Sequence, residues 1–280
     1  MAKQTHIKID GEWIAVSNVW QQVSGVWKKR AVPFVKISGV WQPCMEYPLF
    51  KSLIKYGKLY TWAAATDGTL ITGMTIGTDS EWTTLNNYIN SNYNVSPNDF
   101  GIGNHLKHPR KNGTPVLSSE YNTSTHPRWD SDSTHYGRDT VKFGGLPGGS
   151  YTGSFGYIGS NGYWWSSTER SSSIAWFRVM DYSYGGVTRY YLSKGFGFSV
   201  RCLRTATSGE QSSYNDGDVI EQVTDYDDNI YDCIRIGTQV WTKQNIAATK
   251  YTNGHSISGV YDYNNDSDNT FFATENDSIW

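Results

Sequence analysis

Trp164-Trp165-Ser166-Ser167-Thr168-Glu169 opens a stretch of the chain in which apolar and polar residues alternate. The alternation continues in Ile174-Ala-Trp-Phe-Arg-Val-Met180 and in Gly197-Phe-Ser-Val-Arg-Cys-Leu203. A period of two residues is typical of β-strands, and turn sequences such as Tyr184-Gly185-Gly186 separate these segments. The pattern predicts antiparallel strands whose core residues are Trp164 or Trp165, Trp176 and Phe198.

Two helices are predicted on the amino-terminal side of these strands. Thr78-Asp-Ser-Glu81 is a capping box, in which both side chains accept backbone N–H groups at a helix start. Apolar residues follow it at helical spacing: Trp82, Leu85 and Ile89. A shorter pattern in residues 56–65 predicts a helix with one face made of Leu59, Trp62 and Ala63. The polar chain from about Asn90 to Lys142 has no period and predicts long ordered loops.

The first 43 residues contain a repeat. Trp13, Trp27 and Trp41 lie fourteen residues apart, and each stands two residues after a glycine in an Asp-Gly or Ser-Gly pair. Such pairs between alternating residues predict hairpins with tight turns. Short hairpins are marginally stable alone, so these three must pack on one another or on another surface. A self-contained β-meander and a docking module fit the pattern equally well.

Charge and composition exclude several classes of protein. The 280 residues carry 24 basic and 26 acidic side chains, which is not the basic excess typical of a general nucleic-acid binder. No apolar run is long enough to predict a membrane span. Residues 1–43 hold six basic and two acidic residues, whereas residues 215–280 hold three and twelve. The two ends of the chain are therefore expected to differ in environment or role.

Residues 55–204 resemble the Fibrobacter succinogenes major paralogous domain, a C-type-lectin-like module common in Bacteroidota and their phages. Two of the strand segments above, Trp164–Glu169 and Gly197–Cys202, match the family. The other matching motifs are Leu59-Tyr-Thr-Trp-Ala-Ala64, Asp79-Ser-Glu-Trp-Thr-Thr-Leu85 and Leu146-Pro-Gly-Gly149. The usual His/Leu-Pro lead-in before the capped helix is replaced by Thr75-Ile-Gly77. The resemblance implies an α+β fold: a C-type-lectin-like domain with mostly antiparallel strands and two helices, behind a small all-β amino-terminal module.

The family's usual opening lies at the other end of this chain. Five segments of this chain resemble that opening, in the same order: Asp225-Tyr-Asp-Asp-Asn-Ile-Tyr231, Ile236-Gly-Thr-Gln-Val-Trp241, Asn245-Ile246, Tyr251-Thr-Asn-Gly254 and Tyr263-Asn-Asn-Asp266. We interpret this as a circular permutation; a truncated second copy and exchange of this half between subunits are the alternatives. The expected domains are residues 1–43 (hairpins), 44–204 (lectin-like body), 205–218 (linker) and 219–280 (permuted first half or second partial copy).

A circular permutation makes a prediction about strand pairing. Ile234–Ile236 is expected to pair with Ser199–Cys202, which makes the strands of Cys202 and Cys233 neighbours. A disulfide between these two cysteines then depends on the register of the strands. Cys44, like the other two, is otherwise expected to be a small buried apolar residue.

Enzymatic chemistry finds no support in the sequence, and we expect no catalytic residues and no cofactor. There is no nucleophile elbow, phosphate loop or His-Glu-x-x-His motif, and His105 and His108 precede Pro109 in a predicted loop. One loop offers alternating oxygen ligands of the kind that calcium prefers: Asp262, Asn264, Asp266 and Asp268. The glycine and the closing glutamate of a calcium loop are absent from it, so a solvated acidic loop is the favoured interpretation.

Residues 151–195 favour molecular recognition. They contain seven tyrosines and three tryptophans among many serines and glycines, which is the composition of antibody binding sites. In phage relatives of the fold, the same final strands hold diversified receptor-binding residues. The candidate ligand-binding residues are Tyr157, Asn161, Tyr163, Arg170, Ser171, Tyr182, Tyr184, Arg189 and Tyr190.

These patterns together predict a phage virion protein of the tail, baseplate or capsid that attaches to the bacterial host. The first ten residues contain no apolar signal-peptide core, which fits an adhesin assembled in the host cytoplasm and released by lysis. Trp13, Trp27 and Trp41 would anchor the chain to other virion proteins, and the lectin-like domain of a homo-oligomer would contact a surface glycan or protein. The alternatives are a bacterial surface or secreted glycan- or protein-binding module and a purely structural virion subunit.

Overall fold

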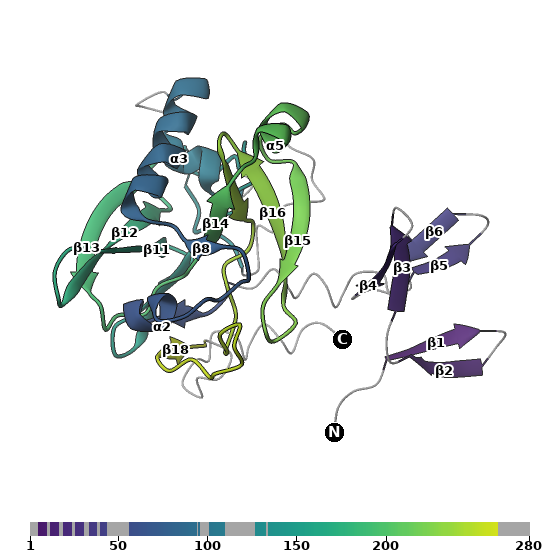
Figure 1. Ribbon diagram of the computed structural model, residues 1–280. Helices are drawn as coiled ribbons and strands as arrows, with labels where there is room; N and C mark the ends of the chain where they lie inside the picture. Colours follow the sequence, from purple (N-terminus) through teal and green to yellow (C-terminus); the bar gives the residue numbers. More distant parts are fainter. Residues whose placement is uncertain are drawn as a thin grey trace. The chain divides into compact units, whose positions relative to one another are not determined.

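The structure is a computed structural model that describes residues 56–93, 95, 101–109, 127–132 and 134–262, together with the backbone of six strands between residues 5 and 43. The chain divides into two compact units, Met1–Ile54 and Lys55–Trp280. Each unit is described by itself. Their elements are labelled in Figure 1.

The first unit contains three separate antiparallel strand pairs. They are β1 (Thr5–Ile9) with β2 (Glu12–Val16), β3 (Val19–Val23) with β4 (Val26–Arg30), and β5 (Phe34–Ile37) with β6 (Val40–Pro43). The three repeated tryptophans occupy the same register position, opposite Lys8, Gln22 and Lys36. The strand pairs therefore follow the fourteen-residue repeat of the sequence.

The second unit, the body, is built on two five-stranded sheets. The first sheet has the order β10 (Phe155–Ile158), β9 (Gly148–Tyr151), β11 (Asn161–Glu169), β12 (Ile174–Asp181) and β13 (Thr188–Ser193). Its pairs are antiparallel except for β9 with β11. The hairpin of β11 and β12 contains the alternating segments that begin at Trp164 and Ile174, so these two predicted antiparallel strands are confirmed. The third alternating segment, Gly197–Leu203, enters a strand only at Cys202, in β14 (Cys202–Thr205).

The second sheet joins segments from both ends of the body. Its order is β15 (Val219–Thr224), β16 (Ile230–Ile236), β17 (Gln239–Thr242), β14 (Cys202–Thr205) and β8 (Thr75–Ile76), with every pair antiparallel. A further pair joins β7 (Leu59–Tyr60) to β18 (Val260–Tyr261). The turn between β16 and β17 contains Gly237, with φ of +59°, which a glycine adopts without strain.

Four helices occur among the described residues: α2 (Trp62–Thr66), α3 (Asp79–Asn92), α4 (Ile102–Leu106) and α5 (Ser208–Ser213). The predicted capping box and the buried face of α3 are confirmed, and Figure 1 shows this helix against the first sheet. The described helices are all too short or too polar to cross a membrane. The second unit is thus mostly antiparallel β-structure with a few helices.

The helix predicted in residues 56–65 begins later than expected. Leu59 belongs to β7, and Thr61 caps α2 by accepting a hydrogen bond from the backbone N–H of Ala64. The buried residues of α2 are consequently Ala64 and Ala65, whereas Ala63 is exposed. The predicted helical face was wrong because it counted a strand residue into the helical period.

Two hydrophobic cores lie on opposite faces of β11. Trp165 belongs to the core that contains Phe177 and Phe198, and Trp164 belongs to the core beneath α3. Both tryptophans are buried, which resolves the alternative that the sequence left open. Trp176 was wrongly assigned to the core: it is half-buried on the outer side of β12, where arginine side chains cover its ring.

The carboxyl-terminal segment completes the sheet of its own chain. The predicted pairing of Ile234–Ile236 with Ser199–Cys202 is wrong, because β17 lies between β16 and β14. Cys233 and Cys202 therefore flank Thr242, about two strand spacings, or about 9.6 Å, apart. Both are buried free thiols, since a disulfide cannot bridge Cα atoms more than about 7 Å apart without backbone movement.

A buried arginine connects the two parts of the body. The Arg201 guanidinium donates to the carbonyls of Phe143 at 2.8 Å, Gly144 at 3.0 Å and Thr242 at 2.7 Å, and to the side-chain oxygen of Asn245 at 2.6 Å. Asn245 in turn donates to the carbonyl of Tyr56 at 2.8 Å. Burial lowers the pKa of Arg201 to about 9, so these acceptors are needed to stabilise its charge.

We predict that Trp241→Ala lowers the free energy of unfolding by about 3–5 kcal/mol, the usual cost of truncating a buried tryptophan. Trp241 is fully buried, with its ring centroid 4.8 Å from that of Trp82 and 5.8 Å from that of Phe143. Urea unfolding of the full chain measures the change. The control, Tyr226→Ala, removes an exposed aromatic ring from the same segment and should cost less than about 1 kcal/mol. If both variants lowered the free energy of unfolding equally, the packing of Trp241 in one core with Trp82 and Phe143 would be contradicted.

Candidate ligand-binding face

Two aromatic rings and two guanidinium groups form a continuous cluster on the outer side of β12 and β13. Trp176 and Tyr191 are register partners, and their rings meet edge to face at 5.2 Å. The Arg189 guanidinium lies 3.3 Å from the Trp176 ring centroid, and that of Arg170 lies 3.4 Å from the Tyr191 centroid. We call these four residues the aromatic–arginine cluster. Cation–π contacts of this kind fix the planes of both guanidinium groups.

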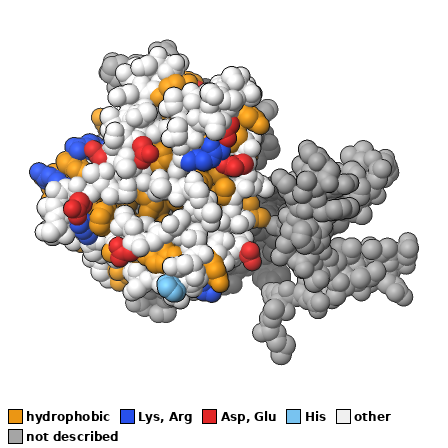
Figure 2. Space-filling view, viewed as in Figure 1, with side chains coloured by type: hydrophobic (Ala, Val, Ile, Leu, Met, Phe, Trp, Pro, Cys, Tyr) orange, Lys and Arg blue, Asp and Glu red, His pale blue; other side chains and the backbone are white. Residues whose placement is uncertain are grey.

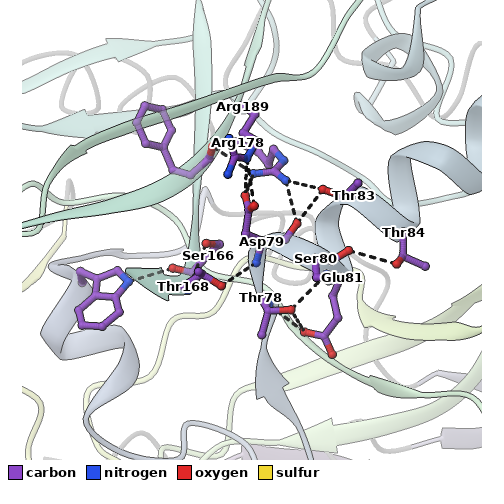
Figure 3. A network of polar contacts seen from close by, with 12 residues as sticks. Thr78, Asp79, Ser80, Glu81, Thr83, Thr84, Ser166, Thr168, Arg178 and Arg189 are labelled. Atoms are coloured by element: carbon purple, nitrogen blue, oxygen red, sulfur yellow. Dashed lines mark hydrogen bonds and ion pairs between the residues drawn. The ribbon is translucent and has the colours of Figure 1, made fainter. Parts of the chain in front are cut away.

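One carboxylate anchors the cluster to the rest of the body. Asp79, the first residue of α3, accepts hydrogen bonds from Arg178 at 2.7 Å and from Nε of Arg189 at 2.9 Å (Figure 3). Burial alone raises the pKa of Asp79, but the hydrogen bonds from Arg189 and Arg178 outweigh it and hold the pKa below its ordinary value. The carboxylate therefore stays charged and keeps the Arg189 side chain in place.

Local sequence explains why Asp79 lies where both arginines reach it. The capping box of Thr78 and Glu81 starts α3 at this point, and Thr168 on β11 accepts the backbone N–H of Asp79 at 3.0 Å (Figure 3). Arg178 is 1% exposed, and it also donates to the carbonyl of Asp79. The helix start is thus held from two strands of the sheet, which makes the cluster rigid.

We predict that Asp79→Asn destabilises the protein most at neutral pH. A carboxyl group whose pKa is lowered by folding contributes stability above its unfolded pKa, about 3.9, and loses it as the pH falls through the folded pKa. The difference in melting temperature between wild type and variant should therefore shrink below about pH 4. Asp130→Asn is the control, because among the described residues the Asp130 carboxylate forms a single surface ion pair, 3.6 Å from Arg128. A difference that is independent of pH would contradict the role of the Asp79 charge.

A second group of candidate residues lies at the other end of the same strands. Tyr157 lies in β10 and is 62% exposed, and Tyr184 lies in the connection between β12 and β13 and is 58% exposed. Beneath them, the Asn161 side chain donates to the Asp181 carboxylate at 3.0 Å. We call Tyr157, Asn161, Tyr182 and Tyr184 the tyrosine loops. An open depression adjoins them, lined by Arg128, Asp130, Ser131, Ser160 and Tyr182.

A buried lysine holds the loop between β12 and β13. The Lys107 ammonium donates to the carbonyls of Tyr184 at 2.8 Å and His135 at 3.1 Å, and to that of Asp181. Lys107 is fully buried against the Trp129 ring. Burial lowers its pKa to about 7, while the charge of Asp181 acts in the opposite direction. The loop that presents Tyr184 is therefore fastened from inside the protein.

We predict that Lys107→Met loosens this loop, because the substitution removes the donor that these carbonyls use, at a cost of about 1–3 kcal/mol for each one left without a partner. Hydrogen exchange of residues 181–186 should accelerate, whereas exchange in β16 should change only in proportion to global stability. Lys142→Met, which removes an exposed lysine, should change neither. Unaltered protection of residues 181–186 in Lys107→Met would contradict the fastening role.

Eight of the nine candidate residues thus fall into two regions rather than one. Arg170, Arg189 and Tyr190 belong to the cluster or lie beside it, and Ser171 is exposed in the turn next to Arg170. Tyr157, Asn161, Tyr182 and Tyr184 belong to the tyrosine loops. Tyr163 is half-buried and stacks on the Phe198 ring at 5.0 Å, where burial raises its pKa to about 12. It supports the core from this position.

Sequence reasoning missed four residues that shape this face: Asp79, Lys107, Trp176 and Tyr191. For Trp176 a signal was available, since it alternates with the buried Ala175 and Phe177 along β12. Tyr191 gave no such signal, because its neighbours Tyr190 and Leu192 are exposed and half-buried. Lys107 and Asp79 gave none. Their roles depend on partners far along the chain, such as Tyr184 and Arg178.

The described residues contain no group of three or more His, Cys, Asp or Glu side chains that could hold a metal ion. Asp262 forms an ion pair with Lys58, and the other members of the predicted calcium loop, Asn264, Asp266 and Asp268, lie outside the described residues. His105 is buried and shares a hydrogen bond with Thr140. Calcium binding by the acidic loop stays a prediction.

Comparison with known proteins defines the family. The sequence model of the Fibrobacter succinogenes major domain matches residues 42–204, which is more than half of the chain. The protein belongs to this family. Neither the search of curated proteins nor the search of solved structures finds a match.

Proposed function

We propose that this protein is a phage virion component whose body attaches the particle to the bacterial host surface. The observation that carries the proposal is the set of exposed aromatic rings held on a rigid framework. Tyr157, Tyr184 and Tyr190 are each more than half exposed, and contacts from the buried Lys107 and the half-buried Asp79 hold the strands and loops around them. Exposed tyrosines with few rotatable bonds give contact area at low entropic cost, as they do in antibody binding sites.

The proposal includes a C-type-lectin-like fold in permuted order. The pairing that it predicted, of Ile234–Ile236 with Ser199–Cys202, is absent and counts against it. Two other strand pairs support it, because β18 pairs with β7 and β17 pairs with β14, joining the two predicted halves within one chain. The two strands that α5 connects, β14 and β15, also lie close together. Arg204 on β14 forms an ion pair with Glu221 on β15 at 2.7 Å. Close ends of this kind are the geometry in which circular permutation is tolerated.

Attachment to the particle is assigned to the hairpins. The equivalent register of Trp13, Trp27 and Trp41 supports a repeated contact with other virion proteins, and a homo-oligomer would multiply it. No enzymatic activity is proposed, and no cofactor is required for this role. The position on tail, baseplate or capsid stays open in the proposal.

The proposal predicts that the fluorescently labelled full chain binds intact cells from a panel of Bacteroidota, as measured by flow cytometry. The triple variant Tyr157/Tyr184/Tyr190→Ala should reduce binding at least about tenfold, because truncating central aromatic contacts typically costs over 1 kcal/mol each. The matched control, Tyr214/Tyr226→Ala, removes two exposed tyrosines from outside the face and should bind like wild type.

A second measurement separates adhesion from assembly. The triple variant Trp13/Trp27/Trp41→Ala should bind cells as wild type does but should no longer be incorporated into particles. If the triple tyrosine variant adheres normally but blocks assembly, the adhesin role is wrong and the protein is a structural subunit. If wild type binds cells and the gene lies beside polysaccharide-utilisation genes, the protein is a bacterial surface module and the virion role is wrong.

A further inference from the structure

The aromatic–arginine cluster carries an excess of positive charge at the surface. The guanidinium groups of Arg178 and Arg189 share a single carboxylate, Asp79, and a third guanidinium, that of Arg170, lies over the Trp176 and Tyr191 rings. Among the residues that the structure describes, Arg170 forms no ion pair. The acidic residue next to it in sequence, Glu169, is instead bound by Lys194 at 2.6 Å. The surface therefore has a positive charge that no acidic residue of the described part neutralises.

Arg170 and Arg189 keep hydrogen-bond donors that bind no partner among the described residues. In the described part of the chain, Arg189 bonds Asp79 through Nε alone, and its side chain is 45% exposed. Arg170 is exposed, and its guanidinium carbon lies 3.4 Å from the Tyr191 ring centroid. Planar stacking leaves the forked donors of an arginine available for two-point binding of a carboxylate or phosphate.

Groups suited to a sugar adjoin these donors. The Tyr190 ring is parallel to that of Tyr191, with centroids 5.2 Å apart, and is 52% exposed. The exposed serines 171–173 supply hydroxyl groups in the turn that follows Arg170. In Figure 2, Lys and Arg side chains stand beside hydrophobic ones along the edge that β13 forms in Figure 1. An aromatic platform, hydroxyls and fixed cations thus occur together.

We propose that the aromatic–arginine cluster binds an oxyanion, a carboxylate or phosphate, borne on a sugar of an acidic surface polysaccharide. The inference rests on the proposed function and specifies its ligand class. Arg170 and the outer edge of Arg189 bind the oxyanion, and Tyr190 and the serine turn contact the sugar. Asp79 does not bind ligand; it positions Arg189.

The test uses isothermal titration of the full chain with two charged probes, oligogalacturonate for carboxylate and dextran phosphate for phosphate. Their neutral counterparts are methyl-esterified oligogalacturonate and dextran. At least one charged probe should bind about tenfold more tightly than its counterpart, and Arg170→Gln should remove most of that difference. Arg170→Lys should restore part of it, because lysine keeps the charge without the planar fork. Lys142→Gln, which removes an exposed cation elsewhere, should match wild type.

Three results would overturn the ligand class: no preference for either charged probe, equal weakening by Arg170→Gln and Lys142→Gln, or undiminished binding by Arg170→Gln. Melting temperature verifies that each variant is folded. Cell binding distinguishes this inference from the proposed function. If Arg170→Gln adheres to cells as wild type does while the triple tyrosine variant does not, the oxyanion site is wrong and adhesion stands. If wild type binds a charged probe and no cells, the site stands and the proposed function fails.

Discussion

The fold of the body depends on the buried guanidinium of Arg201. It donates hydrogen bonds to the loop at Phe143 and Gly144, to the end of β17 and to Asn245. These segments lie far apart in the sequence. A buried charge without such partners would be strongly destabilising, so the segments must come together in one arrangement. Asn245 extends the network to Trp164 and to the start of the body at Tyr56. Polar groups in the interior thereby specify how two hydrophobic cores meet.

The candidate face shows the same construction on a smaller scale. A buried or half-buried charge beneath the surface, Asp79 at one end and Lys107 at the other, fastens groups that are exposed. The exposed rings and guanidinium groups are therefore ordered before any partner arrives. Preorganisation lowers the entropic cost of association, which makes a small contact area sufficient for recognition.

Local patterns in the sequence predicted the local structure well. The capping box at Thr78 and the period of Trp82, Leu85 and Ile89 defined α3, because their physical causes lie within a few residues. The same capping signal at Thr207 and Glu210 would have predicted α5 inside the expected linker.

What could not be predicted depends on distant contacts. Alternation placed Trp176 and Phe177 on opposite faces of β12, but it cannot say whether apolar residues or arginines cover each face. The pairing of β16 with β14 was predicted wrongly because both flank β17, and alternation does not encode strand order. Lys107 is buried against the usual preference of lysine, which only its three carbonyl partners explain.

The pairing of β7 with β18 has a consequence for how the protein reaches its native state. Nearly the whole body lies between these two strands in the sequence, so the contact has a very high sequence separation and forms late. During synthesis β14 leaves the ribosome before β16 and β17, and its edge and the tryptophans of the core stay uncovered until those strands emerge. The nascent chain must therefore survive with an open sheet edge, the state in which chaperones bind and in which newly made copies would aggregate with one another.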